Sequence, residues 1–271
     1  MSSAPAPILI VGAGHMGGAL IAGWRGSLTY DPRDLILIDP APGREALLAY
    51  DDGARLNPPP ESLSEAQVVI LALKPQAWRA AAAEIVPFLD PVAPVISIMA
   101  GVETAAIAQV MGERPVARVM PNTAAAIGAG AASVFCIDSD LCDLAHLLFE
   151  PLGTVVDVDE ESLIHAVTAI SGSGPAYLYA LVEALEAAGV QAGLDVGASA
   201  RLSRATIIGA AALLAQGEES AADLREQVTS PGGTTEAALK ILLGPAGLPD
   251  LLACAVRAGV DRSTELGAPA E

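Results

Sequence analysis

The chain has few aromatic residues and few basic ones. Aromatic residues make up 3% of its 271 positions, and 14 lysines and arginines stand against 32 aspartates and glutamates, a formal net charge of −18. So acidic a chain repels the phosphates of nucleic acids and anionic membrane surfaces, and we expect it to bind neither. An anionic ligand would have to be held by helix N-termini, backbone amides and a few well-placed cations.

Cysteine is scarce as well. The three cysteines, Cys136, Cys142 and Cys254, have neither metal-ligand nor CxxC spacing. We therefore expect no metal site, and we expect the cysteines to be small core residues of a reduced, cytoplasmic protein. No segment has the pattern of a signal peptide, and proline and glycine interrupt the charge-free run 119–137, which argues against a membrane span.

Hydrophobic residues are abundant, at 52% of the chain. In the first 160 residues, short apolar runs alternate with segments of helical periodicity. The strand-like runs lie at 8–11, 35–38, 68–73, 94–98, 116–120, 132–136 and 153–158. This order predicts a Rossmann-type, doubly wound, mostly parallel α/β domain over 1–160. Only helical periodicity follows, which predicts an all-α domain over 161–271.

A glycine-rich turn follows the first predicted strand. The sequence GAGHMG, from Gly12 to Gly17, has the GxGxxG spacing of dinucleotide-binding turns and opens a predicted helix. Glycine at the first position permits the tight turn, Gly14 permits close approach of a pyrophosphate, and Gly17 permits close helix–strand packing. The expected cofactor contacts of this segment are Val11, Gly12, Gly14, His15, Met16 and Gly17.

Asp39 ends the second predicted strand, where a carboxylate accepts the adenosine ribose hydroxyls of NAD and repels the 2′-phosphate of NADP. Arg44 lies five residues on and could serve such a phosphate instead, so both NADH and NADPH remain candidates. The alternative for Asp39 is to cap the turn at the end of the strand.

Lys74 follows the third buried strand, and Lys240 is the only other lysine of the chain. Open α/β sheets bind ligands at the carboxyl ends of their strands, so Lys74 is the best placed cation for a cofactor or a reacting group. The alternative is an ordinary solvated lysine at the end of a strand.

An unusual joint, SPGGTTE, spans 230–236 between two helical segments. Gly232 and Gly233 allow successive amides to point one way, and the next helix adds the positive end of its dipole. Together with the hydroxyls of Ser230, Thr234 and Thr235, this joint could hold a small carboxylate. The same residue types also form ordinary helix caps, so both interpretations stay open from the residues alone.

Six motifs in order along the chain resemble those of the Δ1-pyrroline-5-carboxylate reductases. They are VGAGHMGGALIAG, LALKPQ, SIMAGV, RVMPNT, AVTAISGSGPAYLYALVEAL and LREQVTSPGGTTEAAL. The resemblance implies reduction of the imine of pyrroline-5-carboxylate to L-proline with NADPH or NADH. It also implies a Rossmann domain followed by a helical dimerisation domain, and a homodimer that assembles further into a ring-shaped decamer.

The resemblance also implies roles for individual residues. Ser230, Gly233 and Thr234 would hold the substrate carboxylate, and Thr235 would place its hydroxyl on the ring nitrogen as a catalytic residue, with Lys74 a second catalytic candidate. Glu161 matches an acidic family residue near the ligand, and Asn57 is the candidate for a ribose contact. The remaining implied cofactor contacts are Ala72, Lys74, Pro75, Ile98 and Ala100.

Three other functions compete with this interpretation. The β-hydroxyacid dehydrogenases need a lysine and an asparagine on the helix after the SGSGP turn, but Leu178 and Val182 occupy those places. A reductase linked to coenzyme F420 would account for the N-terminal half only. A dinucleotide sensor without turnover would fit a degenerate second site, and SPGGTTE is not degenerate.

Overall fold

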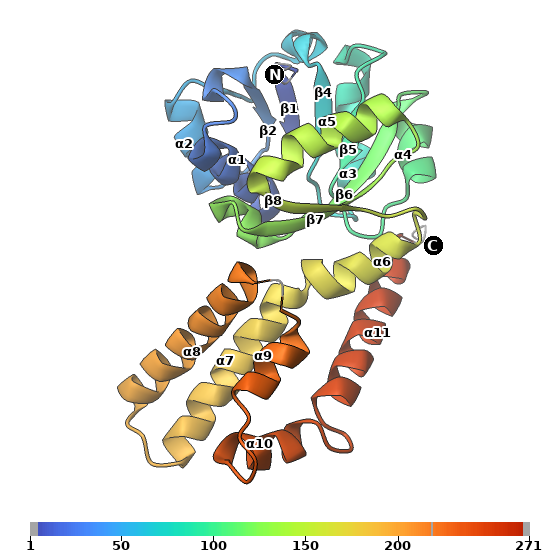
Figure 1. Ribbon diagram of the computed structural model, residues 1–271. Coiled ribbons are helices and arrows are strands. Elements are labelled where there is room, and N and C mark those ends of the chain that lie inside the picture. Colours follow the sequence, from blue (N-terminus) through green and yellow to red (C-terminus); the bar gives the residue numbers. More distant parts are fainter. Residues whose placement is uncertain (1–4, 218, 268–271) are drawn as a thin grey trace. The chain divides into compact units, whose positions relative to one another are not determined.

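The computed structural model describes residues 5–217 and 219–267. Contacts within the chain divide it into two compact units (Figure 1). The first contains the described residues up to Ser173 and those from Ala258 onward, and the second is Gly174–Arg257. None of the described helices is long and apolar enough to cross a lipid bilayer.

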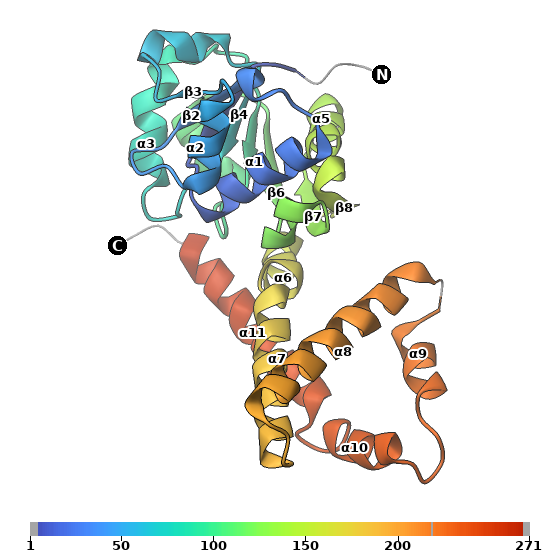
Figure 2. The ribbon, with the colours of Figure 1, turned by 90° about the vertical axis from the view of Figure 1, so that its left-hand side faces the viewer.

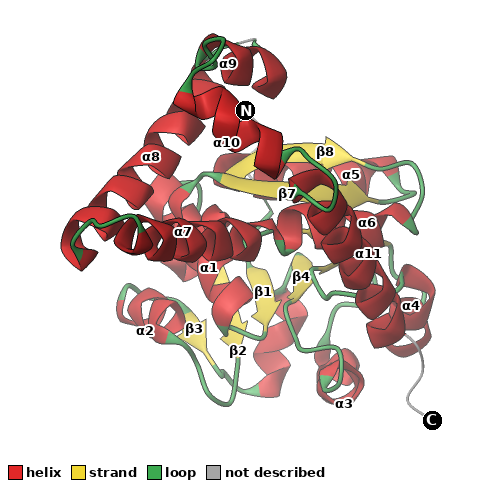
Figure 3. Cartoon of the chain, turned by 90° about the horizontal axis from the view of Figure 1, so that it is seen from below, coloured by secondary structure: helices red, strands yellow, loops and turns green. Residues whose placement is uncertain are grey.

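An eight-stranded sheet in the order β3-β2-β1-β4-β5-β6-β7-β8 forms the centre of the first unit. The strands are β1 (Ile8–Val11), β2 (Leu35–Ile38), β3 (Arg55–Leu56), β4 (Val68–Leu71), β5 (Val95–Ser97), β6 (Val116–Met120), β7 (Gly130–Phe135) and β8 (Gly153–Asp157). Every neighbouring pair is parallel except β6–β7, and β7 and β8 lie side by side in Figure 3. The predicted doubly wound, mostly parallel sheet is confirmed.

Helices cover both faces of this sheet. One core cluster joins Ile8 and Ile10 to α1 (His15–Ser27), α2 (Arg44–Asp51) and α5 (Ser139–Phe149), and the other joins Leu9 and Val11 to α3 (Trp78–Ile85) and α4 (Thr104–Met111). Figure 2 shows α1 and α2 beside each other. Successive residues of β1 therefore serve opposite cores, which explains why this strand is continuously apolar. Short 3₁₀ helices lie at Pro32–Asp34, Pro60–Glu65, Val86–Phe88, Thr123–Ile127 and Glu150–Leu152.

The first unit ends in helical segments. α6 (Leu163–Val167) runs into a π-helical turn, Thr168–Gly172, and the last part of α11 (Leu248–Gly267) also belongs to this unit. His165 Nδ1 lies 2.9 Å from the buried Ser263 Oγ, which connects α6 to α11. Burial, helped by the nearby charge of Arg118, lowers the pKa of His165, so this imidazole is neutral at pH 7.

The second unit consists of helices and their connections. Its helices are α7 (Gly174–Gln191), α8 (Val196–Gln216), α9 (Ala221–Gln227), α10 (Thr234–Leu242) and the first part of α11. α7 and α8 pack against each other (Figure 2), and Ser199 Oγ donates to the carbonyl of Glu186 at 2.7 Å. Large apolar side chains stay exposed here, including Tyr179, Ile208 and Ile241 at 66%, 69% and 78%. Such a surface is typical of a protein–protein interface.

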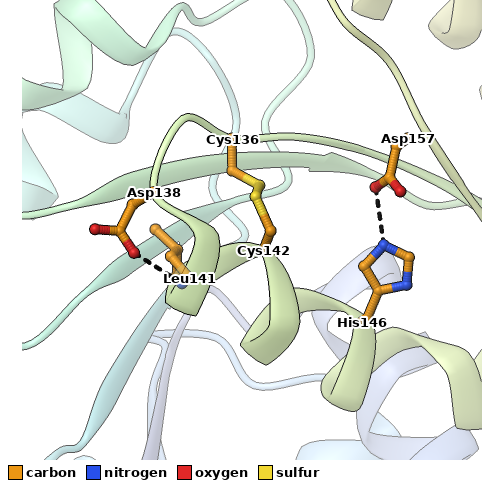
Figure 4. Close-up of a disulfide and its surroundings, with 6 residues drawn as sticks. All are labelled: Cys136, Asp138, Leu141, Cys142, His146 and Asp157. Atoms are coloured by element: carbon orange, nitrogen blue, oxygen red, sulfur yellow. Dashed lines mark hydrogen bonds and ion pairs between the residues drawn. A yellow bond between two sulfur atoms is a disulfide. The ribbon is translucent and has the colours of Figure 1, made fainter.

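The cysteines do not follow the sequence expectation. Cys136, directly after β7, and Cys142 of α5 form a disulfide, with Cα atoms 5.8 Å apart (Figure 4). Cys254 is exposed. The prediction of three reduced core cysteines is therefore wrong. Spacing could not reveal the pair, because the turn into α5, capped by Asp138 on the amide of Leu141, is what brings the two residues together.

His146 of α5 lies between two carboxylates. Its Nε2 is 2.8 Å from Asp157 at the end of β8, and its Nδ1 is 3.1 Å from Glu150 (Figure 4 draws the Asp157 contact). The hydrogen bond with Asp157, and then that with Glu150, raises the pKa of His146. The protonated ring donates through both nitrogens, so it ties α5 to the edge strand.

We expect this contact to make stability depend on pH. Because the folded pKa is raised, the stabilisation is fully present below the ordinary histidine value of about 6.5 and is lost as pH rises through the folded pKa. The free energy of unfolding of His146→Gln should be lower than that of the wild type by on the order of 0.5 kcal/mol at pH 5.5, and the difference should be close to zero at pH 8.5. Urea unfolding of both proteins at the two pH values measures this difference in stability. The same difference at pH 5.5 and at pH 8.5 would contradict the prediction.

Candidate functional site

The glycine-rich turn leaves room for a ligand beside the start of α1. Gly12 has φ +95°, and a Cβ there would lie 2.5 Å from the carbonyl oxygen of Ala72. A Cβ at Gly17 would collide with the carbonyl oxygen of Gly12, so both positions require glycine. A Cβ added at Gly14 would have no other atom within 4 Å, so the space beside this residue is open. The absence of side chains therefore shapes a cradle that backbone amides line.

The N-terminus of α1 is open to an anion. Gly14 occupies its N-cap without a side-chain hydrogen bond, and no acidic residue lies in the first turn. The first amides of a helix have no intrahelical acceptor, and they carry the positive end of the dipole. A hollow of about 550 Å³ lies beside this turn and is lined by Gly14, His15, Gly18 and Arg44, among others. This geometry fits the diphosphate of a dinucleotide.

Asp39 organises the glycine turn from inside the protein. Its Oδ2 accepts the amide of Ala13 at 2.6 Å, and its Oδ1 accepts the amide of Ala41 at 2.8 Å. The alternative in which Asp39 caps the strand-end turn is thus what the structure shows. Each oxygen keeps a further lone pair, so the carboxylate can still accept a ribose hydroxyl.

Asn57 fixes the backbone of Asp39. Its side-chain oxygen accepts the Asp39 amide at 3.0 Å, and its Nδ2 donates to the Asp39 carbonyl at 2.8 Å. Asn57 has φ +46°, a conformation that asparagine tolerates better than most residues. Its side-chain amide therefore acts on the protein itself, whereas the family resemblance implied a ribose contact.

The other expected cofactor residues lie at the carboxyl ends of β1, β4 and β5 or directly after them. The amide of Ala72 donates to Val11 at 2.8 Å, and the amide of Ile98 donates to Leu71 at 3.0 Å, which fixes both connections at the carboxyl edge of the sheet. Val11 and Ile98 are 1% and 6% exposed, so their side chains belong to the core and only their backbones could face a ligand. Pro75 and Ala100 are half-buried.

Lys74 is exposed at this same edge. Among the ion pairs of the described residues, none includes Lys74. Its ammonium is therefore available to a phosphate or to another anionic group near the dinucleotide cradle.

A partly buried ion pair lies elsewhere in the first unit. Arg118 of β6 is 1% exposed, and its Nη1 donates to Glu161 at 3.0 Å. Glu161 also accepts the amide and the hydroxyl of Thr104, at 2.7 Å and 2.8 Å. Burial lowers the pKa of Arg118, and the Glu161 partner opposes this effect. The only signal in the sequence was a charged residue inside an otherwise apolar strand, VARVM.

The SPGGTTE joint has the conformation of a helix start with open amides. Gly232 has φ +73°, its amide donates to Glu236 at 2.5 Å, and the amide of Gly233 donates to the Ser230 carbonyl at 3.0 Å. Those two amides are therefore occupied, contrary to the expectation that the glycine amides hold the ligand. The amides left without an intrahelical acceptor are those of Thr234, Thr235 and Glu236 in the first turn of α10.

The surroundings of the joint keep it compact and polar. A side chain at Gly233 would approach Ser230 Oγ to 2.5 Å, so glycine lets Ser230 lie against the helix start. Glu236 is paired with Lys240 at 3.1 Å, and the Gly232 amide and then Lys240 lower the pKa of Glu236. The joint belongs to the second unit, whereas the glycine turn, Lys74 and Glu161 belong to the first.

A Rossmann sheet with an open glycine turn, together with a helical unit that has open amides at a helix start, fits a dinucleotide-dependent oxidoreductase. A pyrroline-5-carboxylate reductase of Pseudomonas aeruginosa is 37% identical to this chain over 266 residues, and the match covers 96% of each. The chain belongs to the pyrroline-5-carboxylate reductase family.

Family models and solved structures agree with this assignment. Residues 161–266 match the model described as pyrroline-5-carboxylate reductase dimerisation, and residues 7–101 match NADP oxidoreductase coenzyme F420-dependent. A pyrroline-5-carboxylate reductase structure from Coxiella burnetii is 32% identical, with a TM-score of 0.87 over 97% of this chain and 99% of that one. A pyrroline carboxylate reductase from Plasmodium falciparum with NADP bound is 25% identical, with a TM-score of 0.84 over 97% and 98%.

Proposed function

We propose that this protein reduces Δ1-pyrroline-5-carboxylate to L-proline by hydride transfer from NADPH or NADH, the last step of proline biosynthesis. Membership of the reductase family carries the proposal, and the intact SPGGTTE joint supports it. The glycine turn, with open space beside Gly14 and an uncapped helix N-terminus, fits the dinucleotide.

The substrate is a cyclic imine with one carboxylate. In our proposal the amides of Thr234 and Thr235, at the positive end of α10, bind the carboxylate together with the Ser230 hydroxyl. Gly233 contributes by having no side chain, which leaves Ser230 in place. The binding of a small anion by amides and hydroxyls suits a protein whose net charge of −18 repels anions at long range.

Thr235 is the residue we assign to the imine nitrogen. A protonated imine is already electrophilic, so no protein nucleophile is required, and the residues act chiefly by orientation. When bound, the reduced nicotinamide supplies the hydride. The Thr235 hydroxyl accepts from the protonated nitrogen and can remain bonded to it as it becomes an amine. Lys74 is assigned to the cofactor side, as a cation at the carboxyl edge of the sheet.

A spectrophotometric assay tests the function. Purified protein is mixed with pyrroline-5-carboxylate and NADH or NADPH, and the absorbance of the reduced nicotinamide is followed. We expect it to fall with at least one of the two cofactors. Oxidised coenzyme F420 in place of the imine is the control acceptor, because residues 7–101 match a model of that description. Flat traces with the imine and both cofactors would contradict the proposal.

Asp39 gives a prediction about cofactor preference. In Asp39→Asn the charge disappears while one oxygen remains to accept an amide, and Arg44 still lines the hollow beside the turn. We expect the ratio of kcat/KM for NADPH to that for NADH to rise roughly tenfold, because the repulsion of a 2′-phosphate is lost. Steady-state assays with both cofactors measure the ratio. An unchanged ratio would mean that Asp39 only organises the turn.

The assembly and the domain division are part of the proposal. We propose that residues 161–271 form the helical domain, that this domain pairs two chains, and that the dimers build a ring-shaped decamer in the cytoplasm. The dimerisation model over 161–266 and the exposed Tyr179, Ile208 and Ile241 support pairing. Sedimentation equilibrium distinguishes a monomer, a dimer and a decamer.

A further inference from the structure

We propose that Arg118, Glu161 and Thr104 form a positioning bridge that sets the conformation of the β5–α4 loop (98–103) and thereby the affinity for the dinucleotide. The family resemblance implied that Glu161 lies near the substrate, whereas this proposal assigns it a role in cofactor binding. It rests on the proposed function in naming the dinucleotide as the ligand.

The bridge uses the whole carboxylate of Glu161. Oε1 accepts the Thr104 amide at 2.7 Å and Arg118 Nη1 at 3.0 Å, and Oε2 accepts the Thr104 hydroxyl at 2.8 Å. Three donors on two oxygens, one of them a buried guanidinium, leave little negative charge to attract a protonated imine. Glu161 is therefore better suited to fix protein groups than to bind the substrate.

Glu161 also caps α4 from a distance. Glu103 occupies the N-cap of this helix, but its side chain makes no cap hydrogen bond, and it is Glu161 that accepts the amide of Thr104, the first residue of α4. A carboxylate at this end also interacts favourably with the helix dipole. The β5–α4 loop ends where α4 begins, so this distant cap determines where the loop is anchored.

The other side of the loop is held by α11. Gly101 has φ +79°, and a Cβ there would lie 2.6 Å from the Ser263 carbonyl and 2.8 Å from the Gly267 amide. Ser263 in turn hydrogen-bonds His165, one helical turn after Glu161. Residues 161–165 thus hold the loop through both α4 and α11, and Ala100 is the half-buried loop residue that we expect to face the cofactor.

Arg118 makes the bridge sensitive to the loss of Glu161. Its Nη2 is buried and has no hydrogen-bond partner, and Glu161 is its one ion-pair partner among the described residues. Neutralising Glu161 therefore removes the carboxylate that is hydrogen-bonded to this buried guanidinium and leaves only the weaker electrostatic influence of Glu103, a change that the neighbouring backbone must accommodate.

The test measures dinucleotide binding without substrate. NADPH and NADH are titrated into the full-length protein, and the fluorescence of the reduced nicotinamide gives Kd. We expect Glu161→Gln to raise Kd roughly five- to fiftyfold, since a hydrogen bond to a charged group is lost. The KM for pyrroline-5-carboxylate at saturating cofactor should stay within roughly twofold of wild type, because the bridge does not touch the substrate.

Milder variants keep the test informative if Glu161→Gln fails to fold. Thr104→Val keeps the side-chain shape and the backbone amide but removes the hydroxyl, and should raise Kd roughly three- to tenfold. Thr104→Ser keeps the hydroxyl and should restore wild-type Kd. Asp52→Asn is the control, because it breaks an exposed ion pair with Arg25 in the same unit and should leave Kd unchanged.

The outcomes separate this inference from the proposed function. An unchanged Kd in Thr104→Val and in folded Glu161→Gln overturns the positioning bridge. A raised KM for the imine in Glu161→Gln with an unchanged Kd for the dinucleotide overturns it too, and returns Glu161 to the substrate. A wild-type protein that binds NADPH or NADH but does not oxidise it with the imine contradicts the proposed function, while the Kd comparison still decides on the bridge.

Discussion

Replacing Thr235 by alanine is expected to lower kcat/KM for pyrroline-5-carboxylate roughly ten- to a thousandfold, the effect of losing one or two hydrogen bonds that matter in the transition state. Thr235 is a half-buried residue in the first turn of α10, where its hydroxyl and its amide lie at the same helix end. The substitution removes the hydroxyl and leaves the amide, so the carboxylate contact through the backbone should survive.

Two variants control for this result. Thr235→Ser retains the hydroxyl and should recover most of the activity. Thr229→Ala removes a nearby hydroxyl that already donates to the Arg225 carbonyl at 2.6 Å, and it should leave kcat/KM close to wild type. Steady-state kinetics with varied imine at saturating cofactor measure all three. Wild-type kcat/KM in Thr235→Ala would show that the hydroxyl does not act on the nitrogen.

The substitution Gly17→Ala is expected to weaken dinucleotide binding by at least roughly tenfold and to lower the free energy of unfolding by on the order of 1–3 kcal/mol. The reason is steric, because the new Cβ would collide with the backbone carbonyl of Gly12, which cannot rotate away as a flexible side chain could. The turn and the start of α1 must then separate, which displaces the amides that bind the diphosphate.

Gly26→Ala is the matched control in the same helix. A Cβ there meets nothing within 4 Å, and alanine replaces glycine near the end of α1. We expect unchanged cofactor affinity and stability raised by up to about 1 kcal/mol. Fluorescence titration with NADPH and thermal unfolding compare the two variants. Equal cofactor affinities in Gly17→Ala and Gly26→Ala would contradict the cradle.

Much of the fold follows from local pattern. The predicted runs 8–11 and 35–38 coincide with β1 and β2, because strands buried on both faces are continuously apolar. The run 116–120 coincides with β6, where Arg118 is the one charged residue among apolar ones. The edge strand β3, Arg55–Leu56, was not predicted, since two half-buried residues carry no periodic signal. Its place is set by pairing with β2, a contact between segments that are separated along the chain.

The candidate site also has parts that the sequence indicates and parts that only the structure reveals. The glycine turn and the SPGGTTE joint are local structures, so glycine spacing and helix-start residues indicate them directly. The roles of Asp39, Asn57 and Glu161 depend on partners 18 to 57 positions away in sequence. Residue type alone did not distinguish a carboxylate that binds a ligand from one that binds the protein's own amides.

The sequence by itself indicated the order of the helices and of the strands other than β3, because periodicity depends on neighbouring residues. It also indicated the glycine spacing of the first turn and the family that the chain resembles, because both are carried by short motifs. The tertiary structure alone decided which amides of the joint are open, that Cys136 pairs with Cys142, and that Glu161 joins Arg118 to Thr104. A hydrogen bond or an ion pair exists only when two groups meet in space. Which distant groups meet is set by the packing of the whole sheet and its helices.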